Sequence, residues 1–279
     1  MAREFIVYEK PESNIARILL NRPDKLNAQN RQVILEMDDA FHEAEQDDEV
    51  RVVILGGTGR AFSTGHDMSP DRWTKEPHGV GLEGNMAREQ FLYIDKCMYI
   101  RNLPKPTIAQ VQGYCVAAGW MVAAMCDIIV ASQDAIFQDP VLRMTPAAVE
   151  ILFHPWEVGA RKAKEILFTG DGLTAEEAWR LGAVNKVVPR EKLEEETLRL
   201  ARKIALTPHV TVSLTKRSIN RTLDIMGQAN AIDYHFLAHQ MSHHTEQAKQ
   251  FNEQVRQSAY EKGGLREFLK ARDEAYRTA

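Results

Sequence analysis

The chain has 279 residues, of which 44% are hydrophobic and 27% are charged, a composition typical of a soluble globular protein with a substantial core. A net charge of −4 gives no electrostatic reason to expect nucleic acid or an anionic membrane as a partner. The three cysteines lack disulfide or metal spacing, and no apolar run approaches the roughly 18 residues that span a membrane, so we expect a cytoplasmic protein.

The first predicted elements are two short strands that open a sheet. Residues 5–8 and 15–20 are rich in β-formers, and the turn residues at 11–14 between them indicate a hairpin. Asn27 is expected to cap a helix over residues 28–47, in which apolar side chains recur at helical spacing.

A strand is next expected at residues 52–55, followed by a loop rich in glycine and serine that runs to Met68. Residues 69–84 are rich in proline, glycine and charge, with Trp73 as an isolated aromatic. Such segments often shape a substrate pocket. Helical periodicity returns over residues 85–101.

The stretch with the clearest chemical meaning begins at the predicted strand 107–111. After a turn at Gly113, three small residues at 117–119 precede an uncharged helix over residues 120–126. Small side chains let a ligand approach the unpaired amides that open a helix. A second amide from the loop at 56–68 could converge on the same oxygen and stabilise an anion there. Alone, the stretch is more typical of a closely packed buried helix than of an anion site.

The rest of the chain predicts two further strands and then helices. Residues 128–131 and 135–137 have strand composition, and Thr174 with Glu177 forms a capping box for a helix that ends near Gly182. The alternation of strands and helices predicts an α/β layered core. Helices are then expected at residues 193–205, 210–223 and 230–260.

Several motifs together resemble the enoyl-CoA hydratase/isomerase (crotonase) superfamily. The resemblance implies an α/β fold with a crotonase-type β-β-α spiral core over residues 1–205. A C-terminal helical oligomerisation region would follow over residues 206–279 and form a homotrimer or a dimer of trimers. The motifs are residues 21–27 (NRPDKLN), 62–67 (FSTGHD), 104–113 (PKPTIAQVQG), 161–170 (RKAKEILFTG) and 175–184 (AEEAWRLGAV).

The resemblance implies that two backbone amides, those of His66 and Ala118, hold the carbonyl oxygen of an acyl-CoA thioester. Hydratases of the family also carry two catalytic glutamates, and the matching positions here are Met121 and Val141. Neither side chain can transfer a proton, so another acid/base group is required for catalysis.

Two carboxylates are the candidates for that group. Glu150 is a lone charge in an apolar run, and Asp139 precedes a proline. Their alternative roles are a structural salt bridge and a turn-stabilising carboxylate, respectively. His154 and Glu157 are weaker candidates. The resemblance also implies five residues that contact acyl-CoA, namely Lys25, Leu26, Ser63, Asp67 and Met68. The alternative for Lys25 is a solvated lysine in a loop.

The function implied by the resemblance is transformation of an acyl-CoA through a thioester enolate, with enoyl-CoA hydration in fatty acid metabolism as the first expectation. An isomerase or hydrolase with a relocated acid/base group, and a non-catalytic acyl-CoA-binding protein, remain alternatives. RNA binding is disfavoured by the acidic composition. We expect no cofactor beyond the CoA moiety of the substrate and no metal. Histidines at i, i+4 spacing are interpreted as surface or interface residues; these are His235, His239, His243 and His244.

Overall fold

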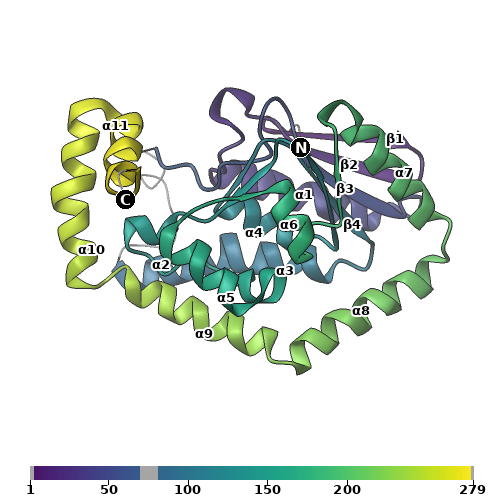
Figure 1. The fold of residues 1–279 in the computed structure, drawn as a ribbon. Coiled ribbons are helices and arrows are strands. Elements are labelled where there is room, and N and C mark those ends of the chain that lie inside the picture. Colours follow the sequence, from purple (N-terminus) through teal and green to yellow (C-terminus); the bar gives the residue numbers. More distant parts are fainter. Residues whose placement is uncertain (1–2, 70–80, 278–279) are drawn as a thin grey trace.

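The computed structural model describes residues 3–69 and 81–277, and its largest feature is a six-stranded mixed sheet (Figure 1). The strand order is β1-β2-β3-β4-β6-β9, and only the β1–β2 pair is antiparallel. The predicted hairpin and the predicted strands of this sheet are confirmed. The strands are β1 (Ile6–Glu12), β2 (Ile15–Leu20), β3 (Val52–Gly57), β4 (Thr107–Val111), β6 (Ile128–Ser132) and β9 (Lys186–Val188).

A second sheet has three short strands in the order β5-β7-β8, namely β5 (Tyr114–Val116), β7 (Ile136–Gln138) and β8 (Leu173–Thr174). The loop after β3 lies along β5, because the Ser63 amide donates to the Tyr114 carbonyl at 3.0 Å and the Val116 amide donates to the Ser63 carbonyl at 2.9 Å. These bonds bring the glycine- and serine-rich loop next to the small-residue segment.

Helices pack on both faces of the large sheet. Alternate residues of β3 point to opposite sides, as in any strand. Val53 and Leu55 join the larger core with α1 and α4, whereas Val52 and Ile54 face α7. The helices are α1 (Arg31–Gln46), α2 (Gly81–Glu89), α3 (Asp95–Asn102), α4 (Ala118–Ala124), α5 (His154–Thr169), α6 (Ala175–Leu181), α7 (Leu193–Ala205), α8 (His209–Ile225), α9 (Gln228–Ser242), α10 (Glu246–Phe251) and α11 (Ser258–Arg277).

The predicted start of the first helix is wrong. The cap of α1 is Asn30, whose side chain accepts a hydrogen bond from the Val33 amide at 2.9 Å. Asn27 instead has a φ of 56° and donates through its side chain to the carbonyls of Thr58 and Ala61, at 2.9 Å each. It therefore fixes the loop that carries the predicted site rather than capping a helix.

Two other predicted helices are interrupted. The 85–101 segment is divided between α2 and α3 by a π-helical turn at Gln90–Ile94, and the 230–260 run breaks after Ser242. Most of the proposed pocket-shaping segment 69–84, including Trp73, lies outside the described residues, although its end, from Gly81, begins α2.

The C-terminal helices follow one side of the core and then turn back (Figure 1). Helix α9 contacts α2, and side chains of α10 and α11 reach the cavity described below. None of the helices in the described part of the chain is long and apolar enough to cross a bilayer.

Candidate active site

Two segments far apart in the sequence touch at Gly65 and Gly119. A Cβ at Gly119 would lie 2.4 Å from the Ser63 carbonyl oxygen, and one at Gly65 would lie 3.1 Å from the Ala118 nitrogen. Neither separation leaves room for a side chain. The amides of His66 and Ala118, which the sequence analysis singled out, therefore belong to segments in direct contact.

Both of these amides are unpaired. No hydrogen-bond partner for either N–H is found within residues 3–69 and 81–277. The neighbouring amides of the first loop are paired, since Gly65 donates to the Ser63 hydroxyl at 3.2 Å and Asp67 donates to the Gln29 carbonyl at 2.9 Å. Because buried or partly buried N–H groups are rarely left without a partner, these two are available to an acceptor from outside the chain.

Ala117, the residue before α4, has a φ of 51° and a ψ of −120°, a conformation that glycine adopts without strain and alanine does not. We predict that Ala117→Gly raises the free energy of unfolding by about 1 kcal/mol, because relief of strain exceeds the added entropy of the unfolded chain. Urea denaturation measures the change. Ala123→Gly, inside the same helix, should instead lower stability by about 1 kcal/mol, and an equal loss in both variants would contradict the prediction.

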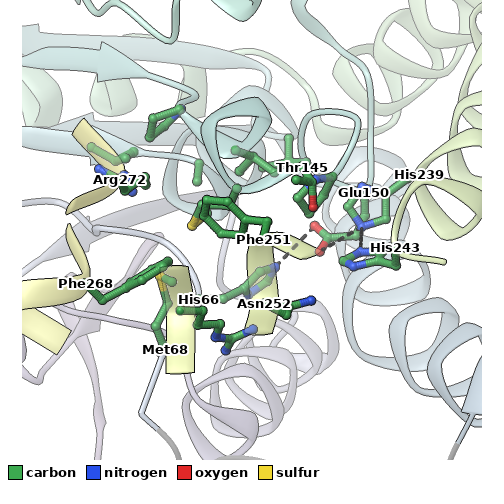
Figure 2. Close-up of a pocket in the computed structure, with 18 of the residues that line it drawn as sticks. His66, Met68, Thr145, Glu150, His239, His243, Phe251, Asn252, Phe268 and Arg272 are labelled. Atoms are coloured by element: carbon green, nitrogen blue, oxygen red, sulfur yellow. Dashed lines mark hydrogen bonds and ion pairs between the residues drawn. The ribbon is translucent and has the colours of Figure 1, made fainter. Parts of the chain in front are cut away.

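A cavity of about 170 Å³ opens beside these segments. Thr64, His66, Val116 and Ala117 line one part of it, and buried ionisable side chains line another. Figure 2 shows Glu150 between the imidazole of His66 and the histidines of α9. The cavity thus brings together an apolar wall, titratable groups and His66, which carries one of the unpaired amides, and Ala117 beside the other. An apolar cavity with a few polar groups is the usual composition of a ligand site.

Glu150 lies at the centre of the ionisable groups and is 5% exposed. One carboxylate oxygen is 3.2 Å from His66 Nε2, and the other is 3.9 Å from His239 Nε2. Burial alone would raise the pKa of Glu150, but the charge and hydrogen bond of His66, together with His239, hold that pKa below its ordinary range. The carboxyl group is therefore ionised at neutral pH.

His66 links Glu150 to the backbone donors. Its imidazole stacks on the ring of Tyr93, with the ring centroids 3.9 Å apart. Because Glu150 is ionised, His66 Nε2 carries the hydrogen that it donates to the carboxylate. The backbone of His66 supplies one of the unpaired amides. Only the side chain of His66 therefore separates that amide from the Glu150 carboxylate.

Asp139 has a different environment. It is 1% exposed and accepts hydrogen bonds from the amides of Val141 and Val149, each at 3.1 Å. Burial raises its pKa to about 6. Asp139 does not line the cavity. Its bond to Val149 fixes the segment that carries Glu150, in keeping with the turn-stabilising alternative.

His154 is completely buried, and neither ring nitrogen has a hydrogen-bond partner in the described part of the chain. Its Nε2 lies 3.4 Å from Asp139, and burial lowers the pKa of the imidazole to about 3. Glu157, the other weak candidate, lines a separate cavity between α8 and the core, where burial raises its pKa to about 7.

The depressed pKa of His154 predicts acid sensitivity. Between pH 3 and 6.5 the unfolded chain binds the proton that His154 excludes in the folded chain, so the contribution of His154 to stability should rise with pH across this window, by on the order of 4 kcal/mol. Asp139 and Glu157 have raised pKa values, so their contributions fall with pH over part of the same window and offset this rise in the wild-type protein. Chemical denaturation of the wild type and of His154→Phe at pH 4 and pH 7 isolates the contribution of His154. The difference in stability between the two proteins should shift in favour of the wild type at pH 7, and a difference that does not change with pH would contradict the prediction.

The residues expected to contact acyl-CoA lie in three different environments. Ser63 and Asp67 are buried and hydrogen-bonded internally: Ser63 donates to the Asn27 carbonyl at 2.8 Å, and Asp67 pairs with Arg22 at 3.0 Å. Lys25 is exposed and Leu26 is half-buried, at a short helical turn. Met68 lines the cavity.

The expectation for the C-terminal histidines is wrong for two of the four. His235 and His239 are 7% and 2% exposed, so they are buried within the chain rather than at its surface. Glu89, which was not predicted as a site residue, is buried at the end of α2 and contacts His239. The i, i+4 spacing of the histidines was the only local signal for this cluster.

Comparison with known proteins gives a consistent result. The family model described as enoyl-CoA hydratase/isomerase matches residues 10–273. The Mycobacterium tuberculosis protein named "Putative enoyl-CoA hydratase EchA13" is 43% identical over 257 residues, which cover 86% of this chain and 81% of that protein.

Solved structures give the same result over most of the chain. A probable enoyl-CoA hydratase from Mycobacterium smegmatis has a TM-score of 0.81 at 45% identity, covering 86% of this chain and 94% of that one. An enoyl-CoA hydratase/isomerase from Xanthobacter autotrophicus has a TM-score of 0.87 at 33% identity, covering 98% of this chain and 99% of that one. The second match includes the C-terminal helices.

Proposed function

Because the chain belongs to the enoyl-CoA hydratase/isomerase family and has its α/β crotonase fold with C-terminal helices, we propose that it adds water to the double bond of a 2-enoyl-CoA. The observation that carries the proposal is the position of Glu150. This ionised carboxylate lines the cavity and contacts the side chain of His66, whose unpaired amide follows Gly65, the residue packed against Ala118. We infer that the two amide donors and the base act on one bound thioester.

In the proposed reaction the amides of His66 and Ala118 donate to the thioester carbonyl oxygen and stabilise the enolate that forms on it. Glu150 accepts a proton from water as the hydroxyl oxygen bonds to C3. The same carboxyl group then returns the proton to C2 as the enolate collapses. One O–H bond and the C2–C3 π bond are broken, one C–O and one C–H bond are formed, and no other reactant is consumed.

We propose that Met121 and Val141 occupy the positions of the family's two catalytic glutamates, so that Glu150 does alone what a pair does in relatives. Met121 is buried and does not line the cavity, whereas Val141 lines it. An apolar side chain in the cavity cannot hold water, so water must be held by Glu150 and its neighbours.

The substrate's CoA moiety is assigned to the surface near Lys25 and Leu26. A lysine that is exposed and has no ion-pair partner within the described residues is available to a phosphate group. We assign Met68 to contact with the acyl-thioester part, and Ser63 and Asp67 to holding the loop between them. No metal or cofactor enters the hydration step itself.

We further propose that residues 206–279 mediate assembly into a homotrimer or a dimer of trimers around the core formed by residues 1–205. Helix α8 and its flanks expose apolar side chains that a single chain does not cover, and this supports the proposal. The residues are Leu206, Val210, Leu214, Ile219, Ile225 and Met226. Light scattering after size exclusion gives the assembly mass.

The test of the proposed reaction is incubation with 2-enoyl-, 3-enoyl- and 3-hydroxyacyl-CoAs of several chain lengths, followed by mass spectrometry. We expect 2-enoyl-CoA to gain the mass of water and 3-hydroxyacyl-CoA to lose it. Release of free CoA would mark a hydrolase, and migration of the double bond would mark an isomerase. Binding without any turnover would mark an acyl-CoA-binding protein, and each of these results would overturn the proposed hydration.

A further inference from the structure

Three metal-ligand atoms converge at the wall of the cavity opposite His66. They are the Glu89 carboxylate, His239 Nε2 and His243 Nε2, all within 4.8 Å of one another. His239 Nε2 is 3.0 Å from His243 Nε2 and 3.5 Å from Glu89 Oε2. Glu89 ends α2, His239 lies in the last turn of α9, and His243 is the residue that caps the end of α9, so the set joins two packed helices.

The spacing matches a coordination shell. Ligands about 2.0–2.1 Å from a zinc ion at tetrahedral angles lie about 3.3 Å from each other, between the two distances found here. Glu150 supplies a further oxygen beside the three ligand atoms, because its Oε1 lies 3.9 Å from His239 Nε2. Two imidazoles and a carboxylate, with a fourth oxygen ligand to the side, suit a first-row divalent transition ion.

Surrounding contacts orient these ligand atoms. His239 Nδ1 lies 2.9 Å from the Ala148 carbonyl, which can only accept, so Nδ1 carries a hydrogen and Nε2 faces the cluster. Glu89 is held by Gln240, at 2.5 Å, and by Arg88, at 3.2 Å. A second shell that fixes imidazole and carboxylate directions is characteristic of metal sites.

The site also concentrates buried carboxylates. Glu89 and Glu150 are 6% and 5% exposed; Arg88 lies 3.2 Å from Glu89, and His66 lies 3.2 Å from Glu150. The two Nε2 atoms face each other at 3.0 Å, where at most one hydrogen fits between them. A divalent ion beside the rings would accept both lone pairs and would be attracted by the two carboxylates.

We propose that Glu89, His239 and His243 bind one divalent transition-metal ion, of which Zn²⁺ fits best, with its open position toward Glu150 and the cavity. This goes beyond the proposed hydration and differs from the expectation, drawn from the family resemblance, of no metal. The cavity gives an ion access, since all three ligands and Glu150 line it.

The test is Zn²⁺ binding by the full chain. Protein stripped with a chelator and incubated with ZnCl₂ should retain about one zinc per chain after gel filtration, as measured by mass spectrometry of the metal. Co²⁺ should give the visible absorption of a low-coordinate site, because the ligand set is compact and partly buried. His239→Asn, His243→Asn and Glu89→Gln should each lower zinc affinity at least 10-fold, within the range for losing a group that fixes the metal.

His244→Asn is the matched control, because this exposed neighbour of His243 is not among the three ligands. It should retain zinc and the Co²⁺ spectrum. Circular dichroism of each variant verifies that it is folded. Retention of less than one-tenth of an equivalent by folded wild-type protein, or equal zinc binding by wild type and all three ligand variants, would overturn the site. Because metal content is read without substrate, either result leaves the proposed hydration standing.

Discussion

Replacing Glu150 with glutamine should lower kcat for hydration of a 2-enoyl-CoA by about 10²–10⁴-fold, the range for loss of a general acid/base group. Glutamine keeps the size of the side chain and its hydrogen bond to His66, but it cannot accept a proton from water. The dissociation constant for a saturated acyl-CoA should change little, because Glu150 does not hold the thioester. Stopped-flow absorbance of the enoyl thioester and calorimetric titration measure the two quantities.

Glu157→Gln provides the control for this experiment. Glu157 is a partly buried glutamate, and it lines the separate cavity between α8 and the core. Its replacement should leave kcat within about two-fold. If Glu150→Gln folds, binds the acyl-CoA and hydrates at the wild-type rate, Glu150 is not the base.

Replacing Gly65 with alanine should also lower the hydration activity strongly, because the added methyl group would displace the backbone donors. A Cβ there would lie 2.8 Å from the Val116 carbonyl oxygen and 3.1 Å from the Ala118 nitrogen, so the two segments must move apart. The two amides would then no longer meet at one oxygen. We expect Gly65→Ala to lower kcat/KM by at least 10²-fold, the cost of losing one donor to a developing anion.

Gly182→Ala separates this effect from backbone strain. Gly65 and Gly182 have φ values of 85° and 91°, but within the described residues a Cβ built at Gly182 meets no atom closer than 4 Å apart from its own neighbours in the chain. Both variants should lose about 1 kcal/mol of stability from the left-handed conformation, and Gly65→Ala should lose more because of its overlap. Only Gly65→Ala should lose activity. Equal kcat/KM values in the two variants would contradict a role for the Gly65 contact.

Local sequence was sufficient where a structure is specified by neighbouring residues. The capping box of Thr174 and Glu177 was predicted and is present, because both hydrogen bonds are made within one turn of chain. The expectation that the loop at residues 56–68 approaches the small residues at 117–119 also agrees with the contacts at Gly65 and Gly119. In that case, small residues were needed at both segments for the backbones to meet.

Local sequence was insufficient where two residues compete or where the partner is distant. Asn27 and Asn30 are equally suited to cap α1, and the positive φ of Asn27 decides between them. Strand β5 has three residues, too few to show an alternating pattern. The burial of His239 depends on Glu89 and Ala148, which are 150 and 91 residues away in the chain. No periodicity within α9 reveals those contacts.

The polarisation of a bound thioester tests the central claim most directly. Butyryl-CoA has no double bond to hydrate, so its complex persists, and a ¹³C label identifies its carbonyl stretch in a difference infrared spectrum. Donation from the His66 and Ala118 amides should shift this stretch to lower frequency than in water, and Gly65→Ala should remove the shift in a complex that still forms. A saturated wild-type complex whose carbonyl absorbs at the frequency found in water would contradict the claim.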